Sequence, residues 1–309
     1  GPELLPKDSP VRVFFSSLAR DFPYASGPEV SVAAQGSLDE VTRWAEGSVA
    51  TLPGVLSART EQRSPQIVAV SVYVDGAAQD QASRDVVASI RENRPAFQTW
   101  VAGPAARLAD FTASTASRAP FAGAVVALGT LALLFLLTGS LVIPLKALVL
   151  NLLSLGASLG ILVWVFQQGH LEWALGFSSN GAIESFIPLL VLAFGFGLSM
   201  DYEVFLISRI AEIYHGGGTT DDAVWHGLQR SGRIITSAAL LIVIVFAGFI
   251  AGQLIVIKQT GLALTTAILL DASLVRMLLV PATMTLLGEW SWWSPAPLRR
   301  WHAKYGIIE

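Results

Sequence analysis

The sequence predicts an α+β membrane protein, in which a small soluble domain precedes a bundle of five transmembrane helices. Its 309 residues are 53% apolar and only 14% charged, whereas about a quarter of the residues of a typical soluble domain are charged. The charged residues gather in residues 1–118, and residues 119–290 are mostly apolar. We therefore expect a soluble domain at 1–118, a transmembrane domain at 119–290 and a basic tail at 291–309.

The soluble domain has the pattern of a β-α-β-β-α-β unit. Residues 29–34 alternate in polarity, which is typical of a strand. Ser37 and Glu40 form a capping box, which predicts a helix that ends near Thr51. The other expected elements are strands at 55–62, 66–74 and 97–101 and an amphipathic helix at 80–92. This order is that of the split βαβ, or ferredoxin-like, fold.

Two further helices are expected at the ends of this unit. Residues 10–22 have the apolar spacing of an amphipathic helix. Gly103 and Pro104 mark the start of another helix, over 105–118, which leads directly into the first long apolar run. The soluble domain is therefore expected to continue into the membrane through a helix.

Five apolar runs are long enough to cross a bilayer, which takes about 20 helical residues. They lie near residues 120–141, 145–167, 185–209, 233–254 and 260–287. Basic residues gather on one side of these spans, at Lys146, Arg209, Arg230, Arg233, Arg299, Arg300 and Lys304. Because basic loops stay in the cytoplasm, we expect the soluble domain to lie outside the cytoplasm and the C-terminus inside it.

The start of the chain predicts a longer protein. The chain begins GPELLPKDSPVR, without Met and without a signal peptide, although its first domain is expected to be exported. We therefore expect a fragment, or one half of a longer protein. One more helix before residue 1 would complete a six-helix half with an exported domain after its first helix.

Asp201 is the first candidate functional residue. It lies in an otherwise apolar run, 187–210, where a carboxylate costs roughly 2.5–3.5 kcal/mol on membrane-insertion scales. A carboxylate at this depth is expected to carry protons, bind an ion or pair with a cation. The alternative is that Asp201 reaches the inner headgroups, because Arg209 is only two turns away. Burial would raise the affinity of such a carboxylate for a proton, as a proton relay requires.

Several function classes lack support in the sequence. There is no cysteine, and the four histidines are scattered, so neither thiol chemistry nor a metal site is predicted. No nucleophilic triad, phosphate loop or dinucleotide fingerprint is present, and no basic patch dense enough for nucleic acid. We therefore expect a protein that is not an enzyme and that needs no cofactor.

Three segments resemble the C-terminal half of an MMPL-type transporter of the resistance–nodulation–division (RND) superfamily. They are GFGLSMDYEVFLISRI at 195–210, GRIITSAALL at 232–241 and LLDASLVRMLLVPATMTLLGEWSWW at 269–293. Segments 143–147 and 153–160 are similar to the same family. The resemblance covers essentially the whole chain, and the Asp-Tyr pair in a glycine-rich helix is its most specific part.

The resemblance implies a function. Such transporters have two similar six-helix halves, each with an extracytoplasmic porter domain, and they export lipids and other hydrophobic molecules from the bacterial inner membrane with the proton gradient. Asp201 and Tyr202 would then form part of the proton relay. Each would pair with a member of the Asp-Tyr pair of the N-terminal half, which this chain lacks. The implied partners are that half, membrane lipids and a hydrophobic substrate.

Other polar residues of the spans have two interpretations each. Glu203 is expected to pair with Arg209 at the interface or to join the relay. Asp271 and Arg276 are five residues apart, about 140° around an α-helix, so we expect them not to neutralise each other but to find partners on other helices. They would form a structural charge network or couple to the proton path.

Three more residues belong to the candidate network. Arg209 matches the family motif and otherwise anchors the topology at the cytoplasmic side. Thr236 and Ser237 lie just inside the fourth span, where they would line the relay or bond back to carbonyl groups of their own helix.

Two alternatives to export stay open. The chain could be part of a protein-translocation accessory whose soluble domain binds an unfolded chain. It could also be a scaffold that has lost transport and only binds a partner.

Overall fold

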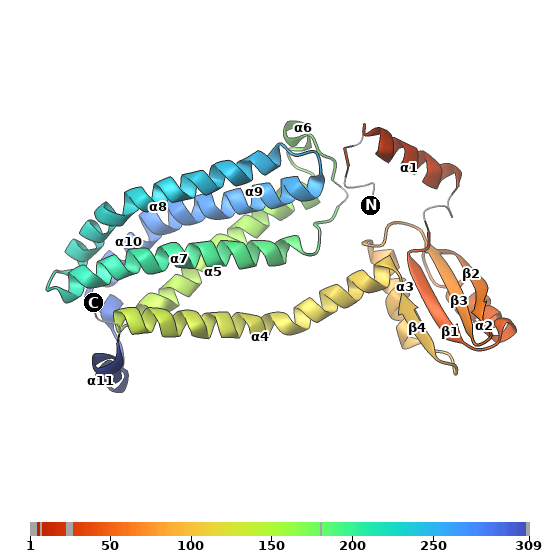
Figure 1. Cartoon of the computed structure of the whole chain (residues 1–309), viewed down its shortest axis with the longest axis horizontal. Helices are drawn as coiled ribbons and strands as arrows, with labels where there is room; N and C mark the ends of the chain where they lie inside the picture. Colours follow the sequence, from red (N-terminus) through yellow and green to blue (C-terminus); the bar gives the residue numbers. More distant parts are fainter. Residues whose placement is uncertain (1–4, 7, 23–26, 180, 307–309) are drawn as a thin grey trace. The chain divides into compact units, whose positions relative to one another are not determined.

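The computed structural model describes residues 5, 6, 8–22, 27–179 and 181–306. The described residues form two compact units. One extends from Asp8 to Pro120, and the other contains residues 5 and 6 and the chain from Phe121 onwards. The first unit contains a sheet, and the second is helical (Figure 1).

The first unit contains a four-stranded antiparallel sheet with the strand order β2-β3-β1-β4. The strands are β1 (Val30–Gln35), β2 (Val55–Ser64), β3 (Ile67–Val74) and β4 (Thr99–Ala102). The helices are α1 (Pro10–Asp21), α2 (Leu38–Trp44), which continues as a short π-helix, η2 (Ala45–Val49), and α3 (Gln81–Glu92). The predicted order of strands and helices is confirmed, with shifts of a few residues at most ends.

The core of this unit lies on one face of the sheet. Val30, Val32 and Ala34 of β1 are buried, and the residues between them are more exposed, as the period of two in a strand requires. The buried residues of α2 and α3, such as Val41 and Val86, join the same apolar cluster. The Oγ atom of Ser37 accepts a hydrogen bond from the Glu40 amide at 3.3 Å, which is the expected helix cap.

A fourth helix, α4 (Pro104–Thr138), begins in the first unit and ends in the second. Arg91 of α3 donates two hydrogen bonds to the Asp110 carboxylate of α4, at 2.6 and 2.9 Å. The hydrogen bond to this carboxylate raises the pKa of Arg91. The helix continues through Pro120 without a break, as the sequence predicts for residues 105–118 and the first span.

The second unit is built from helices. Those after α4 are α5 (Val142–Leu162), η3 (Val163–Gln167), α6 (Glu172–Leu175), α7 (Ile187–His215), α8 (Thr220–Ile250), α9 (Ile255–Leu269), η4 (Leu270–Leu279), α10 (Val280–Leu287), η5 (Gly288–Trp292) and α11 (Ala296–Tyr305). Five helical segments of the described chain are long and apolar enough to cross a membrane. They are 104–138, 142–167, 187–215, 220–250 and 255–292, so the prediction of five helices that could cross a membrane is confirmed.

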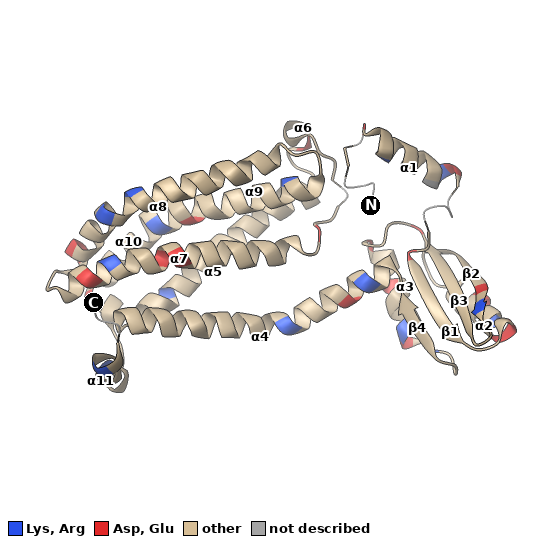
Figure 2. Ribbon diagram, in the orientation of Figure 1, with Lys and Arg blue, Asp and Glu red and all other residues tan. Residues whose placement is uncertain are grey.

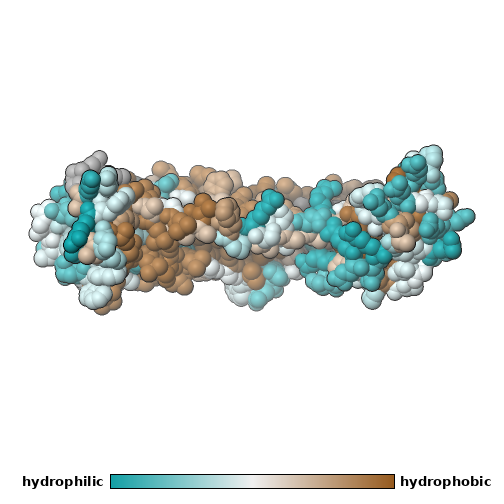
Figure 3. All heavy atoms as spheres, turned by 90° about the horizontal axis from the view of Figure 1, so that it is seen from below, coloured by the Kyte–Doolittle hydropathy of each residue, from teal (hydrophilic) through white to brown (hydrophobic). Residues whose placement is uncertain are grey.

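The spans differ in how far they are enclosed. Helices α7, α8 and α9 lie side by side, and α5 packs against α7 and α9 (Figure 1). Half of the most apolar window of the last span is buried, against 11% for α8. The last span therefore lies at the centre of this unit and α8 at its edge. Apolar residues cover much of the helical surface on the face shown in Figure 3, and charged residues are sparse along the helices of this unit (Figure 2).

Two features of the helices differ from the prediction. Helix α8 is continuous from Thr220, well before the expected span at 233–254, because Thr219 caps it by accepting a hydrogen bond from the Asp222 amide at 3.2 Å. The last span is not a regular α-helix, because its middle third is the π-helix η4.

Candidate functional site

Three consecutive residues of α7 point in three directions. Successive residues of an α-helix are about 100° apart, so Asp201, Tyr202 and Glu203 cannot share a face. Asp201 is exposed, Tyr202 is half-buried and Glu203 is 2% exposed. The helix therefore directs Asp201 away from the other helices of the described chain and Glu203 into them.

Asp201 has no hydrogen-bond or ion-pair partner in the described part of the chain. Phe194, two turns earlier on the same face of α7, is 55% exposed. An acid and a large aromatic residue thus lie together on a face of α7 that this half leaves uncovered. Its pairing with a residue of another half stays a prediction.

Asp271 and Arg276 form a direct ion pair, so the prediction that they do not neutralise each other is wrong. The Arg276 Nε atom donates to the Asp271 Oδ2 atom at 2.7 Å, and both side chains are at most 9% exposed. Both residues lie in η4, which is a π-helix. Its hydrogen bonds join residues five apart, so residues i and i+5 come close to the same side, whereas an α-helix would separate them.

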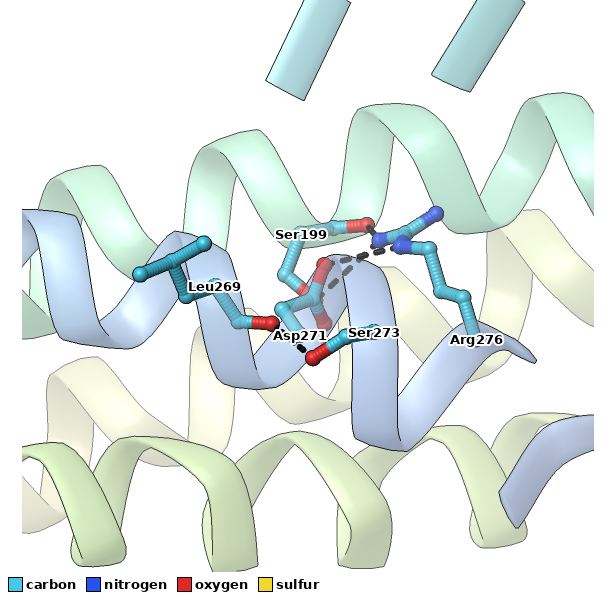
Figure 4. Close-up of polar contacts among 5 residues, drawn as sticks. All are labelled: Ser199, Leu269, Asp271, Ser273 and Arg276. Carbon is cyan, nitrogen blue, oxygen red and sulfur yellow. Dashed lines mark hydrogen bonds and ion pairs between the residues drawn. The ribbon is translucent and has the colours of Figure 1, made fainter. Parts of the chain in front are cut away.

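Ser199 of α7 joins this ion pair, and Figure 4 shows the arrangement. Its hydroxyl donates to the Asp271 Oδ1 atom at 2.5 Å. The Arg276 Nη2 atom donates to the Ser199 carbonyl and lies 3.3 Å from its hydroxyl oxygen. The predicted partner on another helix thus exists. Ser199 was not among the predicted site residues, although it lies two residues before Asp201.

Arg276 also contacts Tyr202 of the Asp-Tyr pair. Its guanidinium carbon lies 5.3 Å from the centre of the Tyr202 ring, within the range of a cation–π interaction. Arg276 therefore connects the Asp271 carboxylate, the α7 backbone and Tyr202. A shift of any one of these groups would therefore change the contacts that Arg276 makes with the others.

Glu203 does not pair with Arg209, contrary to one of its two interpretations. Arg209 instead forms an exposed ion pair with Glu212, at 2.7 Å. Glu203 points inwards, where Lys146, Arg276 and Asp271 act on it electrostatically. Lys146 is not a basic residue of the inner surface, because its ammonium nitrogen is buried.

Thr236 and Ser237 are not brought into this network. Both are exposed on α8. The Thr236 hydroxyl donates to the Gly232 carbonyl at 2.8 Å, and the Ser237 hydroxyl donates to the Ile234 carbonyl at 3.0 Å. They bond back to their own helix, which was the second of their two interpretations.

Sequence similarity identifies the family of this chain. The family model described as the MMPL family matches residues 64–306, which include the sheet strands β3 and β4 and all the spans that carry the site. This chain belongs to the MMPL family. The residues that match the MMPL model include the Asp-Tyr pair of α7, the ion pair of η4 and Ser199.

Curated MMPL relatives match the chain over part of their own length. A putative membrane protein of Streptomyces coelicolor is 42% identical over 99% of this chain and 43% of that protein. The mycolic acid-containing lipids exporter MmpL11 of Mycolicibacterium smegmatis is 36% identical over 93% of this chain and 30% of the exporter. The trehalose monomycolate exporter MmpL3 of Mycobacterium tuberculosis is 43% identical over 58% of this chain and 19% of the exporter. The chain thus spans less than half the length of these relatives.

Proposed function

We propose that this chain is the C-terminal half of a membrane exporter of lipids or other hydrophobic molecules, driven by the proton-motive force. The observation that carries the proposal is the position of Asp201. Its carboxylate lies on a membrane-spanning helix and faces away from the helices of this half, without a partner in the described chain. Two relatives are named as exporters, one of mycolic acid-containing lipids and one of trehalose monomycolate. These names support the proposed substrate class.

Asp201 is the proton-binding group of the proposed relay. A charged carboxylate in the bilayer is unfavourable unless it is paired or reaches water. Binding of a proton removes the charge, and release to the cytoplasm restores it. The face of α7 that carries Asp201 would therefore contact the other half differently in the two states, which can change how the helices pack against each other.

Tyr202 is the second member of the relay. Arg276 holds its ring from within this half, so its hydroxyl has a defined position from which to donate a hydrogen bond to a carboxylate of the other half. Asp271 and Ser199 fix Arg276 in turn. In this proposal the ion pair is a positioning network and does not itself carry the proton.

The first unit is the proposed porter domain. Its element order and its strand order support a ferredoxin-like fold, with helices on one face of an antiparallel sheet. We place it outside the cytoplasm and the basic tail inside it, in the bacterial inner membrane. Because α4 contributes residues to both units, it is the proposed connection through which a change in the spans opens or closes a substrate cavity.

The test compares Asp201→Asn with the wild type in the full-length protein. Both are reconstituted in liposomes with an imposed pH gradient, and export of trehalose monomycolate and proton flux are measured together. We expect Asp201→Asn to lose both activities, because asparagine cannot take up the proton, while the wild type loses export when the gradient is collapsed.

The matched control is Glu212→Gln, which changes an exposed acid of the same helix and is expected to leave transport unchanged. Unchanged export by Asp201→Asn at equal membrane expression would contradict the proton relay. Asp201 would then be a structural charge.

A further inference from the structure

Four charged residues of α5, α7 and η4 form two unequal pairs inside the second unit. They are Asp271, Arg276, Glu203 and Lys146. Asp271 and Arg276 are joined by one direct hydrogen bond, and Ser199 bonds to both of them. Glu203 and Lys146 act on each other electrostatically, but neither the Glu203 Oε1 atom nor the Lys146 Nζ atom has a hydrogen-bond partner in the described part of the chain.

A buried ion pair whose polar atoms lack hydrogen bonds is unusual, because burial of an unpaired polar atom is unfavourable. A buried charge without hydrogen bonds loses its solvation, and Coulomb attraction restores this only in good geometry. Glu203 is 2% exposed and lies in a membrane-spanning helix. If Lys146 were only an anchor for the chain, its ammonium group would reach the headgroups, as lysines near the membrane surface do.

Other buried polar atoms on the same helices also lack partners. On α5, Asn151 is 1% exposed, and both polar atoms of its side chain have no partner among the described residues. The same applies to the Nη1 atom of Arg276. These groups lie on α5 and η4, which pack against each other and against α7.

We infer that Glu203, faced by Lys146, is a second proton-binding site of this half, connected to Asp201 and Tyr202 through Arg276. The inference rests on the proposed proton-driven function and deepens it. In the site, one Glu203 carboxylate oxygen gains or loses a single proton, and no other bond is made or broken. The charges that act on Glu203 are Lys146 on α5 and Arg276 and Asp271 on η4.

The connection runs through contacts within this half. Tyr202 touches Arg276, and Arg276 acts on Glu203. Hydrogen bonds to the Asp271 carboxylate and to the Ser199 carbonyl hold the Arg276 guanidinium group in place. A shift of Tyr202, when the adjacent Asp201 changes its charge, therefore changes how the ring and this fixed charge interact. Glu203, whose Oε1 atom has no hydrogen bond among the described residues, is the group that can respond. Proton binding at Glu203 then follows the state of Asp201.

Infrared difference spectroscopy on the full-length protein tests the inference directly. When the pH is lowered, a protonated carboxyl group adds a C=O band that a carboxylate lacks. We expect one component of the wild-type band to come from Glu203. This component should be absent from Glu203→Gln and present in Asp201→Asn and in Glu212→Gln, a change on the exposed face of the same helix. In Lys146→Met, the acid without its counter-charge is expected to stay protonated, so that its band no longer depends on pH.

A second variant covers the case in which a single substitution prevents folding. Lys146→Met combined with Glu203→Gln removes both charges at once and avoids an unpaired buried ion. We expect this double variant to reach the membrane in normal amount, to lack the carboxyl band and to show proton flux whose pH dependence is flattened.

The outcomes separate this inference from the proposed function. If Asp201→Asn abolishes proton flux but the carboxyl band and the pH profile of flux are unchanged in Glu203→Gln and in the double variant, Glu203 is a structural charge and the inference is wrong. If Asp201→Asn transports normally, the proposed function itself fails, whatever the state of Glu203.

Discussion

At the scale of single residues, direction around the helix matters more than depth in the membrane. Asp201 and Glu203 are equally deep in one apolar run, yet one is exposed and the other is buried. The sequence identified the acids but not their directions. In a soluble helix the apolar face marks the inside, but in a bilayer the lipid-facing side is as apolar as the core, so polarity does not show which side is inside.

The buried ion pair leads to a prediction about stability. Arg276→Ala leaves Asp271 buried without its counter-charge, which typically costs about 3–5 kcal/mol. We expect a clear loss of thermal stability of the detergent-solubilised full-length protein, measured as the midpoint of unfolding. Arg209→Ala, which breaks only the exposed pair with Glu212, is expected to cost less than about 1 kcal/mol.

The double replacement of Asp271 by Leu and Arg276 by Met completes this test. It removes both charges, so most of the lost stability should return. A double variant as unstable as Arg276→Ala would show that hydrogen bonds to Ser199, and not the unpaired charge, hold η4 in place.

At the scale of elements, periodic patterns of apolar residues were sufficient to predict the strands and helices of the first unit. The strands of the sheet follow from the alternation of apolar and polar residues, because one face of each strand is exposed to water. The start of α2 follows from its capping residue, Ser37. The π-helix η4 was not predicted. Its hydrogen bonds join residues five apart, and neither composition nor apolar spacing distinguishes it from an α-helix. The site was therefore predicted in its residues, but the ion pair of Asp271 and Arg276 was missed for this reason.

The turn between β4 and α4 depends on one glycine. Gly103 has φ +101°, and a Cβ atom there would lie 2.9 Å from the Glu29 carbonyl oxygen and 3.0 Å from the Ser31 nitrogen. We expect Gly103→Ala to destabilise the edge of the sheet by about 1–3 kcal/mol, since strained backbone conformations cost this much. Hydrogen exchange of the β1 and β4 amides measures the loss.

Gly47→Ala is the control for this turn. Gly47 lies in the helical segment η2, and nothing lies within 4 Å of an added Cβ atom. Alanine is the better helix former by about 1 kcal/mol, so exchange should be unchanged or slower. If both variants exchange alike, the close contact at Gly103 is relieved by movement of the backbone.

At the scale of the whole molecule, the uneven exposure of the spans is consistent with a chain that covers less than half of its relatives. Only 11% of the apolar window of α8 and 22% of that of α4 are buried. In a single isolated bundle all these faces would contact lipid, whereas in a two-half transporter some would contact the other half. The Asp201 face of α7 is the proposed place for that contact.

The orientation of the chain gives the last prediction. An odd number of spans, such as the five candidate helices, would place the first unit and the basic tail on opposite sides of the membrane, and the positive-inside rule then predicts a cytoplasmic tail. Lys146 does not support that assignment because its ammonium nitrogen is buried, but Arg299, Arg300 and Lys304 of the tail do.

Because this chain has no cysteine, single introduced cysteines can show on which side of the membrane a residue lies. In intact cells expressing the full-length protein without other accessible cysteines, a membrane-impermeant maleimide should label Ser64→Cys, in the exposed end of β2, and leave Arg300→Cys unlabelled until the membrane is opened. Labelling of Arg300→Cys alone would reverse the orientation and, with it, the direction in which Asp201 releases its proton.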